Sequence, residues 1–302
     1  MRSRRGRPVN GLLLLDKPVG LTSNAALQTV KRIYQAAKAG HTGSLDPLAS
    51  GLLPICLGEA TKLSGFLLNA DKSYRFTCCL GVKTTTGDAE GEVLMSRPVG
   101  AVGREQVERA LQQFTGVIQQ IPPMHSAIKR NGQPLYKLAR EGIEVEREPR
   151  QITIYELRLL HLEGNRMECE MRCSKGTYVR TLAMALGDVL GCGAHISALR
   201  RTAVAPFDAG QMETLESLRE RAGQEGLAAL DSVLLPLDSA VAHWPAVRVK
   251  SDMAFYLRQG QPIMVPHAPT QGWVRLYQNE QQFLGLGEIL DDGRVAPRRL
   301  LA

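Results

Sequence analysis

One aspartate lies in a stretch of small and polar residues. The segment AGHTGSLDPLASGLLP, residues 39–54, surrounds Asp46 with Gly, Thr, Ser and Pro. An Asp-Pro pair is a common helix start, with Asp as the N-cap and Pro47 at the first helical position. Alternatively, the loop, whose glycines allow tight turns, holds one carboxylate rigidly for chemistry. His41 offers a further polar group, although a single histidine is more often structural. Both interpretations of Asp46 stay open at this point.

An arginine far along the chain is the second candidate. The segment KGTYVRTLAMALGDVLG predicts a turn and then a helix with Thr177 as its N-cap, which puts Arg180 in the first turn. The helix dipole disfavours a cation there, so a buried Arg180 would need an anionic partner. A guanidinium can bind a carboxylate through two hydrogen bonds and keep it ionised. A solvent-facing Arg180 fits the pattern equally well.

A tyrosine on a predicted strand is the third candidate. The segment SYRFTCCLG alternates, with Tyr74, Phe76, Cys78 and Leu80 on one face. Tyr74 is most simply a core aromatic. At a strand end it could instead stack on a planar ligand such as a nucleobase.

The charge of the chain favours a polyanionic partner. The 37 Lys and Arg exceed the 30 Asp and Glu, which gives a net charge of +7 over 302 residues. Lysines and arginines that replace phosphate counterions supply most of the non-specific affinity for nucleic acid. The N-terminal MRSRRGRP carries Arg2, Arg4, Arg5 and Arg7. It predicts either a disordered basic tail or an arm that touches phosphates.

Motifs for cofactor and metal chemistry are missing from the sequence. It has no P-loop, no GxGxxG after a strand, no GxSxG and no metal-ligand cluster. We therefore expect chemistry on one carboxylate without metal or cofactor. No run approaches the roughly 20 apolar residues of a membrane span. We read the six cysteines as reduced thiols in a reducing compartment and expect a cytoplasmic protein without membrane contact: Cys56, Cys78, Cys79, Cys169, Cys173 and Cys192.

The elements that must position these residues follow from hydrophobic spacing. GLLLL predicts a buried strand that ends at the turn DKPVG, and TSNAALQTVKRIYQAAKAG predicts a helix that Ser or Thr caps and Gly40 stops. GREQVERALQQFTG predicts an amphipathic helix, and QITIYELRLL and RMECEMRC predict successive strands.

The remaining segments predict an insertion and a second domain. IPPMHSAIKRNGQPLYKLAREG predicts a long irregular loop, which is usually functional or disordered. Residues 205–240 look helical and polar, HWPAVRV looks like a boundary, and short strands follow it. Antiparallel strands with segregated helices predict an α+β fold with a small β-rich C-terminal domain.

Six motifs in order resemble the TruB family of tRNA pseudouridine synthases. The resemblance covers roughly residues 10–205; the C-terminal segment is similar, more weakly, to a PUA-type RNA-binding domain. Ser44 and Ser50 stand where we would expect Ala and Thr, and neither replaces an acting group. The motifs are GLLLLDKPVGLTS, GHTGSLDPLASGLLP, DKSYRF, IPPMHSAIKRNGQPLYKLAREG, SKGTYVRTLA and ISALRRTAVAPF.

The resemblance implies a fold and a reaction. The fold is a pseudouridine synthase fold with a central mixed, mainly antiparallel sheet flanked by helices. Residues 1–243 would form the catalytic domain, with an RNA-gripping insertion at about 118–150, and residues 244–302 the PUA-like domain. The enzyme would isomerise uridine 55 in the T arm of tRNA to pseudouridine, by base flipping and without a cofactor.

The resemblance also implies roles for particular residues. Asp46 would be the catalytic carboxylate, Arg180 its salt-bridge partner and Tyr74 the residue that stacks on the flipped uracil. Whether Asp46 first attacks C1′, attacks C6 or removes a sugar proton stays open. The other implied residues are His41 near the flipped site, Tyr178 and Leu199 in the pocket wall, Lys17 with Pro18 under the floor, Lys129, Arg130 and Lys137 on the T arm, and Arg298 and Arg299 at the acceptor end.

Other functions remain as alternatives. One is a tRNA-binding folding chaperone that needs no catalysis, although such a protein would not need the carboxylate. Another is a pseudouridine synthase that acts on ribosomal RNA or is guided by a separate RNA. A third is a small-molecule enzyme with a helix-capping aspartate. The leading prediction is a monomeric enzyme whose partner is tRNA.

Overall fold

A nine-stranded mixed sheet forms the larger part of the molecule. The computed structural model describes residues 6–301, so Arg2, Arg4 and Arg5 of the predicted basic tail lie outside the described residues. The strands run in the order β1-β3-β12-β4-β11-β10-β7; β2 pairs with β3, and β13 with β12. Among the described strand pairs of this sheet, only β12–β3 is parallel. The strands are β1 (Gly11–Lys17), β2 (Ala39–His41), β3 (Ala49–Leu57), β4 (Lys72–Leu80), β7 (Gly116–Gln120), β10 (Arg150–Glu163), β11 (Arg166–Cys173), β12 (Ala194–Val204) and β13 (Phe207–Asp208).

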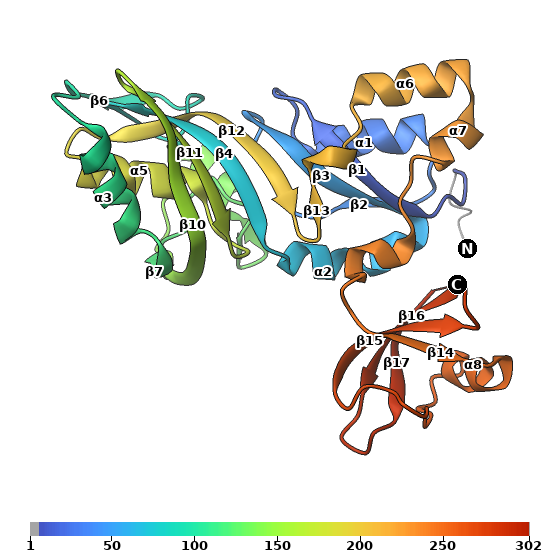
Figure 1. The fold of residues 1–302 in the computed structure, drawn as a ribbon. Helices are drawn as coiled ribbons and strands as arrows, with labels where there is room; N and C mark the ends of the chain where they lie inside the picture. The colour runs from blue at the N-terminus through green and yellow to red at the C-terminus, as the bar shows by residue number, and fades with distance from the viewer. Residues whose placement is uncertain (1–5, 302) are drawn as a thin grey trace.

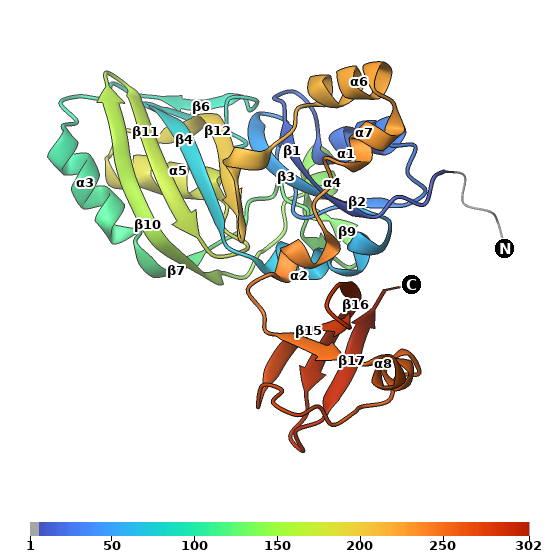
Figure 2. The ribbon, with the colours of Figure 1, turned by 45° about the vertical axis from the view of Figure 1, so that its right-hand side comes forward.

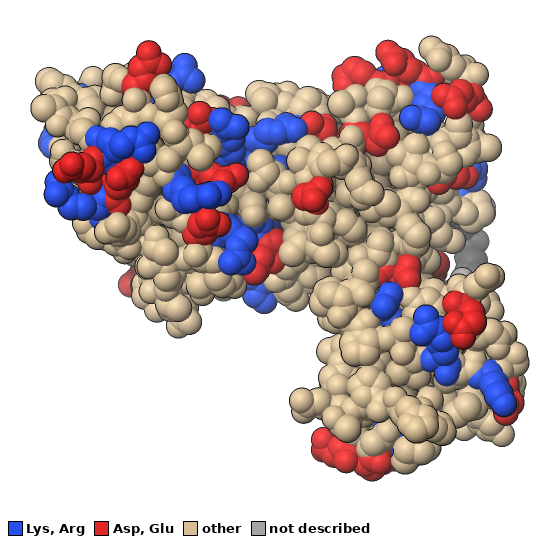
Figure 3. Space-filling view, viewed as in Figure 1, with Lys and Arg blue, Asp and Glu red and all other residues tan. Residues whose placement is uncertain are grey.

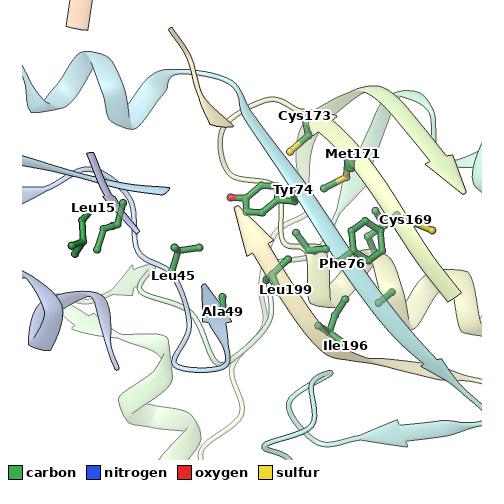
Figure 4. Packing of buried hydrophobic residues seen from close by; sticks show 14 of the residues in the cluster. Leu15, Leu45, Ala49, Tyr74, Phe76, Cys169, Met171, Cys173, Ile196 and Leu199 are labelled. Atoms are coloured by element: carbon green, nitrogen blue, oxygen red, sulfur yellow. The ribbon is translucent and has the colours of Figure 1, made fainter. Parts of the chain in front are cut away.

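Helices cover one face of this sheet, and at the β1–β3 end a short helix and two 3₁₀ turns cover the other face as well. α5 (Val179–Val189) packs on β12 and α3 (Arg104–Gln113) on β10, while α1 (Ser23–Ile33) lies against β2 and β3 (Figure 1). The predicted alternation in β4 is confirmed, because Tyr74, Phe76, Cys78 and Leu80 are all buried. Figure 4 shows Tyr74 and Phe76 packed beside Met171 of β11 and Leu199 of β12. The α+β prediction is therefore correct, and β4 brings Tyr74 into the covered layer.

The first predicted helix is shorter than its sequence suggested. Thr22 caps it by accepting a hydrogen bond from the Ala25 amide, as expected. It ends at Ile33, not at Gly40, because Gln35 adopts a left-handed conformation with φ of +50°. The chain then forms β2, whose backbone pairs with β3.

The predicted irregular insertion contains regular structure. Lys129–Arg130 (β8) and Gln133–Pro134 (β9) form a hairpin, and α4 (Leu135–Arg140) follows it. Asn131 and Gly132 both have positive φ, which suits the two-residue turn of such a hairpin. The Asn-Gly pair was the sequence signal for this turn.

A smaller sheet forms the C-terminal part. β14 (Ala246–Val249), β15 (Gly272–Gln278), β16 (Gln282–Ile289) and β17 (Val295–Leu300) pair in that order, with α8 (Ser251–Arg258) beside them. Both views show this sheet below α2 (Ser64–Asn69) (Figures 1 and 2). The other elements are β5 (Val82–Thr84), β6 (Val93–Ser96), α6 (Leu215–Gln224), α7 (Leu227–Asp231) and three 3₁₀ turns, Gly58–Lys62, Ala209–Gln211 and Leu237–Val241.

Two further observations concern the thiols and the helices. All six cysteines are free, and Cys79 is the only one of them that is not fully buried. Across residues 6–301, none of the helices has the length and apolar character needed to cross a membrane.

Candidate active site

A hollow of about 390 Å³ brings most of the predicted site residues together. It opens where the Asp46 loop, β4, β12 and the start of α5 meet. Residues that are far apart in sequence therefore share one wall. The predicted residues that line it are His41, Asp46, Tyr74, Tyr178, Arg180 and Leu199.

Asp46 does not cap a helix. Residues 42–48 form bends and a turn, in which the Ala49 amide donates to the Asp46 carbonyl. The hydroxyl of Ser23, the first residue of α1, accepts from the Leu45 amide at 2.7 Å and donates to the Leu45 carbonyl at 3.0 Å. These bonds fix the backbone just before Asp46, so the loop holds one carboxylate at the hollow.

Arg180 binds the Asp46 carboxylate in a fork geometry, through two of its nitrogens. Its Nε lies 2.9 Å from Oδ2 of Asp46, and its Nη2 donates to Oδ1 at 3.3 Å. The remaining donors reach the carbonyls of Thr86 at 3.0 Å and His125 at 2.7 Å. The guanidinium is buried with every side engaged, which excludes the solvent-facing alternative and fixes its direction.

Burial and charge act on Asp46 in opposite senses. Removal from water raises the pKa of the Asp46 carboxyl, and the Arg180 guanidinium lowers it. Nearby Asp88 adds to the rise, and the net direction is upward from the ordinary value. The side chain keeps 38% of its surface exposed on the side of the hollow, so a ligand there can reach the carboxylate.

Aromatic and aliphatic side chains form the walls of the hollow. Tyr74 is 8% exposed and Leu199 is 7% exposed. Burial raises the pKa of the Tyr74 phenol, so the side chain stays protonated at neutral pH. Tyr178, not Thr177, is the N-cap residue of α5, and its backbone is held by Gln120, whose amide bonds both its N–H and its carbonyl. Thr177 instead donates to the Ser174 carbonyl.

Of two further polar residues of the predicted site, one lines the hollow and the other does not. His41 lines the hollow from β2, and its buried Nδ1 has no hydrogen-bond partner in the structure. Burial, followed by the charge of Arg201, lowers the pKa of this imidazole and keeps it neutral. Lys17 does not line the hollow. It is fully buried, and its Nζ donates to the carbonyls of Pro18 and Leu21, which fixes the turn before α1.

Lys129 and Arg130 lie apart from Asp46. Both are exposed on the β8–β9 hairpin and line a second hollow of about 290 Å³, together with Arg147 and Arg150. Any contact that these residues make with RNA would therefore lie outside the hollow that contains Asp46.

Sequence reasoning missed three buried charges near Asp46. Asp88 is 3% exposed, with its carboxylate 3.7 Å from the Nε of Arg180. Lys72 lines the hollow, and its Nζ donates to the carbonyls of Leu67, Leu68 and Ala70. Arg201 is 1% exposed and also lines the hollow. The sequence offered only weak signals for them, such as the turn-forming TTTGDAEG around Asp88.

A metal site finds no support among residues 6–301, where no group of three or more His, Cys, Asp or Glu side chains is placed to hold an ion.

Three family models match successive parts of the chain from residue 31 onward. Residues 31–179 match the model of the TruB family pseudouridylate synthase N-terminal domain. Residues 180–242 match that of the tRNA pseudouridylate synthase B C-terminal domain, and residues 245–301 that of the C-terminal region of pseudouridine synthase II TruB.

Individual proteins with similar sequences or structures agree with these family matches. The tRNA pseudouridine synthase B of Nitrosococcus oceani is 59% identical over 300 residues, which is 99% of this chain and 97% of that protein. The protein of the same name from Coxiella burnetii is 57% identical over 98% of this chain and 96% of its own length. A solved structure titled as a Cbf5-Nop10-Gar1 complex matches with a TM-score of 0.75 and 28% identity, over 96% of this chain and 84% of that one.

Proposed function

The chain belongs to the TruB family of pseudouridylate synthases, and on that premise we propose that it isomerises uridine 55 in the T arm of tRNA to pseudouridine. The pairing of Asp46 with Arg180 at an open hollow is the observation that supports this most strongly. In the reaction the base leaves the sugar through N1, turns and rejoins it through C5. Substrate and product contain the same atoms, so no co-substrate is required.

Asp46 is the catalytic carboxylate in this proposal. Attack on C1′, attack on C6 and removal of a sugar proton all require it ionised. The two hydrogen bonds from Arg180 stabilise that form against the effect of burial. Because Arg180 is itself held by two carbonyls, it orients the carboxylate from a fixed position in the structure.

The hollow receives the target base after it leaves the RNA stack. Extrusion costs a few kcal/mol, which new contacts in the pocket offset. Tyr74 offers a ring for stacking, Leu199 and Tyr178 form the walls, and His41 lies at the border. A volume of about 390 Å³ falls within the usual range for small-molecule pockets.

In this proposal, the RNA binds on the face of the molecule at which the hollow opens. On the opposite face, over β4, β10 and β11, basic and acidic side chains are mixed (Figure 3). Arg75 pairs there with Glu168, and Arg158 with Glu170, so the charge of that face is largely neutralised. A polyanion gains more favourable electrostatic interaction on the side of the insertion, where Lys129, Arg130 and Lys137 lie.

We assign the domains as the sequence predicted them. Residues 1–243 form the catalytic domain with the insertion at about 118–150, and residues 244–302 a PUA-like domain that meets the acceptor end through Arg298 and Arg299. These contacts position the RNA and do not specify its sequence. The protein acts as a monomer in the cytoplasm, where its free thiols stay reduced.

One experiment tests the reaction and the role of Asp46. The protein is incubated with an unmodified T-arm stem–loop, and pseudouridine is mapped chemically. Wild type converts the target uridine, whereas Asp46→Asn binds the RNA and loses at least about 10³-fold in rate. Glu168→Gln, which breaks an arginine pair on the opposite face, is the matched control and keeps full activity.

Three outcomes would contradict the proposal. Conversion by Asp46→Asn would refute the catalytic role of the carboxylate. Equal binding of any hairpin without conversion would favour a folding chaperone. Conversion of ribosomal RNA fragments but not of the T arm would assign another substrate.

A further inference from the structure

We propose that Lys72 and Arg201 form a basic wall of the hollow, which stabilises the uracil as an anion while it is detached from the sugar. The inference deepens the proposed function and rests on it for its kinetic test. The observations that carry it are the burial of the two cations, the kind of partner that each has, and their place on one face of the sheet.

The two cations of the basic wall are buried side by side. Lys72 is 7% exposed and Arg201 is 1% exposed, and both line the hollow. Lys72 and Tyr74 point to the same face of β4, because they are two positions apart on one strand. Arg201 of β12 lies directly opposite Tyr74 in the strand register. Lys72 and Arg201 thus occupy diagonal positions on neighbouring strands, which are within reach of long side chains.

Backbone carbonyls are the hydrogen-bond partners of both cations. The Nζ of Lys72 donates to the three carbonyls at the end of α2. Arg201 donates from Nε to the Leu52 carbonyl at 2.7 Å and from Nη2 to the Gly43 carbonyl at 3.2 Å. These bonds fix the positions of the two charges but do not neutralise them.

The carboxylates beside the basic wall bind other arginines. Asp71 of the β4 end pairs with Arg172 at 3.9 Å, and Asp16 of β1 pairs with Arg200 at 2.7 Å. Within residues 6–301, neither cation of the basic wall forms an ion pair with a carboxylate. Two positive charges therefore face the hollow without an anionic partner.

This arrangement is unfavourable in the free protein. The pKa of Lys72 is lowered to about 8, first by burial and then by the charge of Arg201. The same charge, after burial, lowers the pKa of His41, so the field of Arg201 extends over the hollow. Apolar side chains of similar size often pack at least as well as buried charges. An anion in the hollow would offset the repulsion, whereas stability alone does not explain the pair.

The aspartate loop gives another part of the hollow the opposite sign. Asp46 and Asp88 carry two negative charges against the one positive charge of Arg180. The hollow is therefore negative at the catalytic carboxylate and positive at the basic wall. Charges that are fixed before a reaction stabilise a charge that develops during it, because no group has to reorient.

The detached base has the charge that the basic wall would stabilise. When the C1′–N1 bond breaks, its electron pair stays on the base and spreads over N1, O2 and O4. At the same time C1′ bonds to an oxygen of Asp46, or the sugar gives Asp46 a proton that it later regains. The base then turns and C5 bonds to C1′, while C5 loses one proton and N1 gains one. Because uridine itself is uncharged, the wall acts on the rate more than on affinity.

The burial of the two cations favours the base over a phosphate of the RNA backbone. All three donors of Lys72 are engaged, and Arg201 has almost no exposed surface. Such groups act through their field on a ligand inside the hollow, where the dielectric constant is low. Tyr74, on which the base stacks in the proposed function, lies next to Arg201 in the register.

Variants that change charge or shape separately test the inference. Arg201→Gln removes the charge and keeps a hydrogen-bond donor, whereas Arg201→Lys keeps the charge. We expect Arg201→Gln and Lys72→Met to lower the single-turnover rate at saturating T-arm stem–loop at least about tenfold, with affinity changed less than about twofold. Arg201→Lys should stay within about threefold of wild type. Arg200→Gln, on a residue whose charge is already paired, is the matched control.

Three outcomes would overturn the inference. A loss of affinity without a loss of saturated rate would mean that the cations bind a backbone phosphate. Equal losses in Arg201→Lys and Arg201→Gln would show that shape and not charge is required. A rate of Arg201→Gln equal to that of Arg200→Gln would show no special role. If Arg201→Gln does not fold, as judged by circular dichroism, Lys72→Met carries the test.

A measurement with a free base separates this inference from the proposed function. The probe is 5-nitrouracil, an acidic uracil whose anion absorbs at longer wavelength than its neutral form. Wild type should bind the anion at least about tenfold more tightly than the neutral form, which lowers the pKa of the bound probe. Arg201→Gln should lose this preference and Arg200→Gln should keep it, even if wild type converted no uridine.

The results of this titration are interpreted apart from turnover. Equal binding of both forms of 5-nitrouracil by wild type, or no binding at millimolar concentration, would overturn the basic wall as an anion site. A preference for the anion without conversion of the stem–loop would refute the proposed function alone.

Discussion

The carboxylate of Asp46 is both exposed to the hollow and bound to a buried arginine. Burial raises the pKa of the Asp46 carboxyl above its usual value. The charge of Arg180 lowers this pKa, but only in part. The ionised form, which the proposed mechanism requires, is thus present above this raised pKa and is lost as the pH falls through it.

We therefore predict an acid limb in the rate of pseudouridine formation. Its apparent pKa should lie above that of an ordinary aspartate, with a loss of about tenfold per pH unit below it. Arg180→Met removes the stabilising charge and should move the limb to higher pH. Single-turnover rates between pH 4 and about 8 measure this. A limb that stays in place in Arg180→Met would mean that another group titrates.

At the scale of elements, the site depends on how α1 holds the aspartate loop. Ser23 makes two hydrogen bonds to the backbone of Leu45 from a buried position. A buried amide left without a partner costs about 1–3 kcal/mol.

Ser23→Ala should therefore lower the free energy of unfolding by about 1–2 kcal/mol. It should also reduce the rate, because Asp46 follows Leu45 directly. Urea unfolding and single-turnover kinetics measure the two effects. Thr29→Ala is the control on the same helix, since its hydroxyl donates to the Ala25 carbonyl and accepts from Arg32, both within α1, and does not contact the aspartate loop. Equal effects of the two variants would contradict a special role of Ser23.

The elements also show what sequence patterns can predict. The alternation of apolar and polar residues predicted that Tyr74 lies on the covered face of its strand. This prediction needed no tertiary information, because successive side chains of any strand point to opposite faces. The end of α1 could not be predicted, since the left-handed Gln35 and the pairing of β2 depend on β3. The contact of Asp46 with Arg180 spans 134 positions, and only the resemblance suggested it. Arg200 and Arg201 are identical in type, so only the position of β12 in the sheet decides which one is buried.

At the scale of the whole molecule, the insertion presents exposed cations on the side of the hollow. Lys129→Ala and Arg130→Ala together should weaken binding of the T-arm stem–loop and reduce the dependence of log K on log salt by about one per lost phosphate contact. The rate at saturating RNA should stay unchanged. Binding isotherms at several salt concentrations measure this, with Arg158→Ala on the opposite face as the control. Equal salt slopes for both variants would place the RNA elsewhere.

The C-terminal sheet is joined to the catalytic part through an aromatic cluster on α2. Phe66 packs edge-to-face on Trp244 at 4.9 Å and on Trp273 at 5.4 Å, and the two indoles stack at 5.5 Å. Two positions after Phe66, Leu68 lines the hollow. The short helix therefore has one side in the domain contact and the other at the site.

Loss of this contact should change both the stability of the protein and the rate of the reaction. Phe66→Ala should destabilise the protein by about 2 kcal/mol, less than for a fully buried phenylalanine. It should also lower the rate several-fold, because Leu68 and the α2 carbonyls held by Lys72 lose their support. The chain has only two tryptophans, and both belong to this cluster, so their fluorescence reports on the cluster during urea unfolding. Phe255→Ala, 59% exposed on α8, is the control. If Phe66→Ala changes the fluorescence but not the rate, α2 does not transmit the domain contact to the site, and the C-terminal domain serves only to hold RNA.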